Sequence, residues 1–172
     1  MVATMLLVVG IVATAQMFVL ATTGNLSAQR GTYTAALAQE KMEQLRGMTW
    51  GYDEIGLPVT DFATNIAQSP PTDDGVGLSP SPPNTLSANV EGYVDYLDRF
   101  GNSLGTGAAT PANAVYVRRW SVEPLPTNPN NTLVLQVLVF VPHDRKDNGN
   151  GAVLDRRKDE ARLVSVKSRK SR

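Results

Sequence analysis

The first 23 residues of this chain are the feature that most constrains its fold. From Met1 to Thr23 no side chain is charged, and Gln16 is the only strongly polar one. An apolar helix of about 20 residues is long enough to cross the hydrocarbon core of a bilayer. A domain of this size could hardly cover such a helix on all sides. We therefore expect a helix that is held in a membrane or in the core of a filament.

A cleaved signal peptide is the first alternative for this segment. The apolar run is longer than the region of about 7–15 residues found in signal peptides, and no charged residues precede it. A helical pattern without proline also continues beyond it to Trp50. We therefore predict one long helix, with residues 1–24 as a transmembrane or filament-core segment and residues 25–50 as an amphipathic stem.

The stem has an apolar face and a polar one. The apolar face is predicted to pack on a sheet of the same chain, and its residues recur at helical three- and four-residue steps: Ala35, Ala38, Met42 and Leu45. The charged residues fall mostly elsewhere: Glu40, Lys41, Glu43 and Arg46. We expect these charges to be solvated or paired between subunits.

The remainder of the chain changes character twice. Residues 51–90 are rich in proline, glycine and serine and predict a long variable loop. Residues 91–172 carry strand patterns separated by turn sequences. The expected strands are Glu91–Leu97, Asn113–Val122, Thr132–Val141 and Ala161–Lys167. The connections suit an antiparallel meander, and laying the stem on it gives an α+β fold. Thr132–Val141 is apolar on both faces, which predicts a covered or central strand.

Little in the sequence points to catalysis. There is no cysteine and one histidine, which excludes thiolate chemistry and metal sites built on two imidazoles. His143 follows a predicted strand, and no G-x-S-x-G motif is present. Asp144–Asp155 contains oxygen ligands and glycines, but its spacing does not fit a calcium-binding loop, so we expect a turn. We expect no enzyme, no cofactor and no metal.

Charge offers one further candidate partner. Lys and Arg together equal Asp and Glu at 16 each, so the whole chain has no net attraction for nucleic acid. The C-terminus is locally basic, and such a cluster can bind DNA or anionic lipid. A solvated tail is the favoured interpretation. The basic residues are Arg156, Arg157, Lys158, Arg162, Lys167, Arg169, Lys170 and Arg172.

Three segments resemble one family. MVATMLLVVGIVA is similar to the body of the N-terminal segment of type IV pilins and pseudopilins. Ala36–Arg46 (ALAQEKMEQLR) resembles the stem of the PilV-like minor pilins, also called pilus modification proteins. YVRRWSVEP followed by LVLQVLVFVP resembles their sheet. Aligned on MVAT, the family's leader, cleavage glycine, terminal phenylalanine and glutamate would all precede Met1, so cleavage and N-methylation are expected from the resemblance alone.

The resemblance implies a fold, a role and a location. The fold would be a long helix packed on a small antiparallel sheet, and the role would be that of a structural subunit of a type IV pilus-type filament. The partners would be other pilin subunits, the pilus assembly machinery and, before assembly, the bacterial inner membrane with the domain in the periplasm. A type II secretion pseudopilin, or a single-span protein with a periplasmic binding domain that never polymerises, are the alternatives.

Two sets of residues become candidate contacts between subunits. Small residues let membrane helices approach closely. Those of the apolar segment are Ala3, Thr4, Gly10, Ala13, Thr14, Ala15 and Ala21. On the stem, the candidates lie off the face assigned to the sheet: Leu26, Tyr33 and Leu37.

Overall fold

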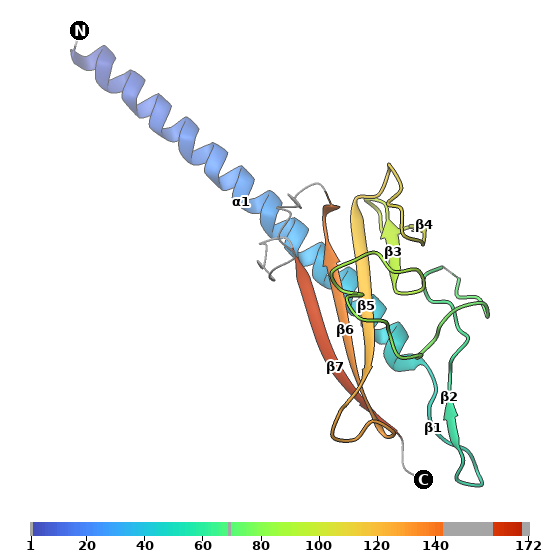
Figure 1. Cartoon of the computed structure of the whole chain (residues 1–172). Coiled ribbons are helices and arrows are strands. Elements are labelled where there is room, and N and C mark those ends of the chain that lie inside the picture. Colours follow the sequence, from blue (N-terminus) through green and yellow to red (C-terminus); the bar gives the residue numbers. More distant parts are fainter. Residues whose placement is uncertain (1, 69, 143–159, 170–172) are drawn as a thin grey trace.

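One long helix and one antiparallel sheet make up most of the fold, and the predicted α+β class is confirmed (Figure 1). The computed structural model describes residues 2–68, 70–142 and 160–169. Helix α1 runs without interruption from Val2 to Gly47. It ends at Gly47, within the predicted stem of residues 25–50. Arg46 lies in its last turn, and a basic side chain there suits the negative end of the helix dipole.

The main sheet has five antiparallel strands in the order β4-β3-β5-β6-β7. Their bounds are Val94–Leu97 for β3, Ser103–Gly105 for β4, Tyr116–Pro124 for β5, Thr132–Phe140 for β6 and Ala161–Ser168 for β7. β6 lies between β5 and β7, as its two apolar faces predict. The short edge strand β4 is not among the predicted strands, because three residues ending in glycine carry no alternating pattern.

The C-terminal half of α1 crosses one face of this sheet over β5, β6 and β7 (Figure 1). The largest side chain buried between the two layers is Trp120, and Leu45 of the helix is also fully buried. The opposite face of the sheet has its own smaller apolar cluster. Its members are Val94, Tyr96, Ala114, Val117, Leu138 and Phe140.

The proline- and glycine-rich stretch begins with a short hairpin that the sequence did not reveal. It pairs β1 (Trp50–Tyr52) with β2 (Pro58–Thr60). Most of the described residues that follow are loops and turns, yet Ile66 and Leu78 are buried in the main core. Gly75 permits a close crossing, because a Cβ there would lie 2.2 Å from the Cα of Asn65. These residues fold against the core of their own chain.

Candidate functional site

The N-terminal half of α1, through Leu26, carries more than half of the exposed large apolar side chains among the described residues. Figure 1 shows it projecting beyond the sheet. Through Leu26, every described side chain of the helix is exposed to solvent, including Phe18 at 76%. The helix is long and apolar enough to cross a membrane or to act as a signal sequence. A soluble monomer rarely leaves an apolar surface of this extent uncovered.

Three threonine hydroxyls within this segment are satisfied by the helix itself. The hydroxyl of Thr14 donates to the carbonyl of Gly10 at 3.0 Å, and that of Thr22 donates to the carbonyl of Phe18 at 2.8 Å. Thr23 likewise donates to the carbonyl of Val19 at 2.9 Å. Unpaired polar groups are costly in lipid, so these threonines suit an environment without water.

The small residues of the segment have no packing role within the chain. Those whose side chains the structure describes are all exposed: Ala3, Ala13, Thr14, Ala15 and Ala21. A Cβ added at Gly10 or Gly24 would meet nothing within 4 Å. The side chain of Thr4 lies outside the described part. Glycine costs about 1 kcal/mol against alanine inside a helix, so nothing in the chain itself accounts for Gly10. Contacts between subunits at these positions stay a prediction.

The stem contacts the sheet through a face slightly different from the predicted one. Ala38, Met42 and Leu45 are buried in the core, but Ala35 is exposed. Thr34 and Leu37 are buried in its place. The buried face is therefore rotated toward Leu37, which the sequence placed among the contacts to other subunits.

The two other predicted inter-subunit residues keep accessible surface. Leu26 is 51% exposed, and Tyr33 is partly buried against the ring of Tyr116, with ring centroids 5.3 Å apart. Both line the pocket that is described below.

A buried ionic cluster lies between the stem and the sheet, and for Lys41 it corrects the expectation that the stem charges are solvated or paired between subunits, whereas Glu43 and Arg46 are exposed. Nζ of Lys41 lies 2.8 Å from Oδ2 of Asp95, and both side chains are buried. Arg118 donates to the same carboxylate from Nε and Nη2 at 2.9 Å each. Its Nη1 also lies 3.4 Å from Oε2 of Glu40, which is 54% exposed. The stem is thus tied to strands β3 and β5 within one chain.

Lys41 is the most perturbed ionisable group of this cluster. Burial lowers the pKa of its ammonium from 10.5 to about 8, an effect that the Asp95 carboxylate opposes and the Arg118 guanidinium reinforces. The ammonium also donates to the carbonyl of Ile66 at 2.5 Å and lies 4.5 Å from the centre of the Trp120 ring. These partners compensate in part for its removal from water.

Sequence reasoning missed this cluster although a signal was present. Lys41 stands three residues after Ala38 and four before Leu45, so it shares their helical stripe. Asp95 interrupts the apolar strand YVDYL. The neighbouring Arg119 points to the opposite face of β5 and donates to Asn89 at 2.6 Å.

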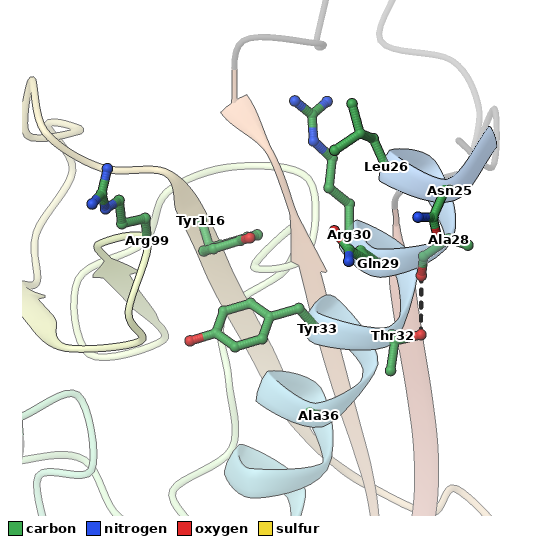
Figure 2. Close-up of a pocket in the computed structure, with 10 residues that line it drawn as sticks. All are labelled: Asn25, Leu26, Ala28, Gln29, Arg30, Thr32, Tyr33, Ala36, Arg99 and Tyr116. Atoms are coloured by element: carbon green, nitrogen blue, oxygen red, sulfur yellow. Dashed lines mark hydrogen bonds between the residues drawn. The ribbon is translucent and has the colours of Figure 1, made fainter. Parts of the chain in front are cut away.

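A pocket of about 720 Å³ lies where the stem leaves the domain (Figure 2). Two arginines and two tyrosines stand among its neutral residues, and the lining contains no acidic side chain. The lining residues are Asn25, Leu26, Ala28, Gln29, Arg30, Thr32, Tyr33, Ala36, Arg99 and Tyr116.

The described part of the basic C-terminal cluster is engaged within the chain. Nζ of Lys167 donates to the carbonyl of Met48 at 2.6 Å, and Arg162 donates to Gln136 at 2.6 Å. The guanidinium of Arg169 lies 3.8 Å from the centre of the Trp50 ring. The remaining members, together with His143 and Asp144–Asp155, lie outside the described residues.

Neither a search for metal-binding groups among the described residues nor the comparisons with known proteins indicate a function. Within residues 2–68, 70–142 and 160–169, no three His, Asp or Glu side chains are placed to hold a metal ion. Comparison with protein-family models, with curated proteins and with solved structures gave no match. The long apolar helix packed on an antiparallel sheet is consistent with a pilin-like fold.

Proposed function

We propose that this chain is a structural subunit of a type IV pilus-type filament, of the minor-pilin kind, and that it acts by assembly rather than catalysis. One observation carries the proposal. A single unbroken helix is fixed to the sheet along its C-terminal half and has no cover along its N-terminal half. An apolar helix of this kind is stable in a bilayer and equally in a bundle of like helices.

Both locations follow from that property. Before assembly the N-terminal half would span the inner membrane, with the domain in the periplasm. In the filament it would pack against the same segment of other pilin subunits, where lipid contacts are exchanged for helix contacts and small residues permit close approach. The partners that we propose are therefore the inner membrane, other pilin subunits and the pilus assembly machinery.

The decisive experiment uses cells that produce the chain. Filaments sheared from their surface would contain the chain, detected by mass spectrometry together with its N-terminal peptide. Gly10→Leu should insert into the membrane normally but be depleted from the filament fraction, because the added side chain meets nothing in its own chain yet blocks a close neighbour. Val9→Leu is the matched control, since it adds one methylene at an exposed, already bulky position.

The outcomes separate the alternatives. A chain absent from sheared filaments but recovered in cross-linked oligomers at the inner membrane would indicate a type II secretion pseudopilin. A monomer that stays in the membrane would indicate the non-polymerising single-span protein, and the filament proposal would fail.

A further inference from the structure

Arg30 is the first charged residue of the helix, and its position along the helix fixes its depth relative to a bilayer. No residue before Arg30 is charged. At 1.5 Å per residue, Val2–Thr23 spans about 33 Å, close to the thickness of about 30 Å of the hydrocarbon core. Arg30 then lies about 10 Å beyond Thr23 along the helix, just outside a headgroup layer of about 5–8 Å and within reach of it for a long arginine side chain.

The sheet brings a second cation to the same place. Arg99 belongs to the turn between β3 and β4, where the Asp98 carboxylate accepts from the backbone N–H of Phe100 at 2.7 Å and of Asn102 at 2.9 Å. Gly101 has a φ of 85° and seats this turn on the stem, since a Cβ there would lie 3.0 Å from Oη of Tyr33. The turn is thus held against the helix.

The space between the two arginines is suited to an anion. Figure 2 shows Arg30 and Arg99 on either side of the Tyr33 and Tyr116 rings, with the Arg30 guanidinium directed toward the end from which α1 leaves the domain and the Arg99 guanidinium at the outer edge, on the side away from the rings. Among the described residues, neither guanidinium has a carboxylate within salt-bridge distance. Arginine binds phosphate through paired N–H groups, and tyrosine is enriched at membrane surfaces.

We propose that this pocket binds the phosphate headgroup of an anionic phospholipid, with Arg30 and Arg99 as its two cationic ligands. The proposal rests on the membrane-inserted stage of the proposed function. It goes beyond that function, because it gives the domain a preferred lipid and a fixed position on the membrane surface. Phe100, which is 68% exposed beside Arg99, adds an apolar contact at the same level.

The test uses the full chain in a non-ionic detergent with two lipid probes, dioleoylphosphatidylglycerol and dioleoylphosphatidylcholine. Native mass spectrometry measures the bound fraction as each lipid is added. A basic residue at an anionic surface contributes about fivefold in affinity. The wild type should therefore prefer phosphatidylglycerol by about 25-fold, and the Arg30→Gln/Arg99→Gln variant should bind both lipids equally.

Arg46→Gln is the matched control. It removes one positive charge from the same helix, about 24 Å farther along, and among the described residues its guanidinium forms a salt bridge only with the exposed Glu43, at 3.5 Å. It should keep the preference of the wild type. An equal loss in Arg46→Gln, or equal binding of both lipids by the wild type, would overturn the proposal. A pocket reserved for a carboxylate of a neighbouring subunit would give the second result.

Flotation separates this proposal from the one on which it rests. Both arginine variants should float with phosphatidylcholine vesicles, because Val2–Thr23 drives insertion without them. Failure of the wild type to float would overturn the membrane stage and the lipid site together. Flotation without a headgroup preference would overturn the lipid site alone.

Discussion

Asp95→Asn is the change that tests most directly how the stem is fixed to the sheet. The substitution keeps the shape of the side chain and removes the only buried negative charge of the cluster. Lys41 and Arg118 both contact that carboxylate, at 2.8 and 2.9 Å. In the variant, two cations would remain side by side between α1 and the sheet, with the half-exposed Glu40 as their only carboxylate partner among these four residues.

The size of the effect follows from what each cation can do. Breaking a buried ion pair by removing one partner costs about 3–5 kcal/mol. Because the Asp95 carboxylate raises the pKa of Lys41, its loss would lower that pKa from about 8, and Lys41 could then lose its proton at pH 7 for less than about 1.4 kcal/mol, which limits its share. Arg118 cannot lose its proton. We therefore expect the free energy of unfolding to fall by about 3–4 kcal/mol, or the melting temperature by roughly 10–15 °C for a domain of this size.

The assay is urea unfolding of the full chain in a non-ionic detergent, followed by tryptophan fluorescence. Trp120 is fully buried and lies under the Lys41 ammonium, so it reports the layer that is perturbed. Asp73→Asn, an exposed position, is the control. Adding Lys41→Met to Asp95→Asn should recover at least about 1 kcal/mol relative to the sum of the single changes. A loss no larger than that of the control, or strict additivity, would refute the reasoning.

Three further predictions follow from the same contacts. The pKa of Lys41 is about 8 in the folded chain and 10.5 in the unfolded chain, so the unfolded chain binds more protons between these pH values. The free energy of unfolding of the wild type, relative to that of Lys41→Met, should therefore rise by about 3 kcal/mol from pH 8 to 10.5. A difference that does not change with pH in urea titrations would contradict this prediction. Lys167→Met should lower the free energy of unfolding by about 1–3 kcal/mol, since Nζ donates to the last carbonyls of α1 at Leu45 and Arg46 and to Met48; unchanged urea midpoints would argue against this cap. Val12→Lys should weaken membrane insertion by about 3 kcal/mol in flotation assays while leaving the tryptophan-monitored melting temperature unchanged, because Val12 is exposed; a lower melting temperature would show contacts that the structure lacks.

The long helix and the long strands were predictable because each spans enough residues for its sequence pattern to be recognised. Residues 2–47 lack proline and are first continuously apolar and then amphipathic, and β5, β6 and β7 are each eight or nine residues with strong strand composition. β1, β2 and β4 have three residues each, too few for a period to emerge. Their pairing depends on turns and contacts that become defined only when the core forms.

Of the candidate sites, one could be predicted from the sequence and two could not. The exposed apolar helix was predictable, because an uninterrupted run without charge has few other uses. The pocket was not, since Arg99 comes to Arg30 only through the turn after β3, and no local pattern links residues 69 positions apart. The ionic cluster was hidden for a different reason. A charge on an apolar stripe is usually assigned to the solvent, and only its partner on another element shows that it is buried.

The two halves of α1 meet opposite requirements, and this explains why so many attachments gather on one of them. Leu45 in the core, the Lys41–Asp95 pair and the Lys167 cap fix the C-terminal half by three different kinds of interaction. In the proposed function the N-terminal half leaves one apolar environment for another, and such ties would oppose that transfer. Because the helix is continuous, an orientation imposed on the domain is passed to the apolar N-terminal half. Weakening the ionic cluster should therefore loosen that coupling even where the apolar half is unchanged.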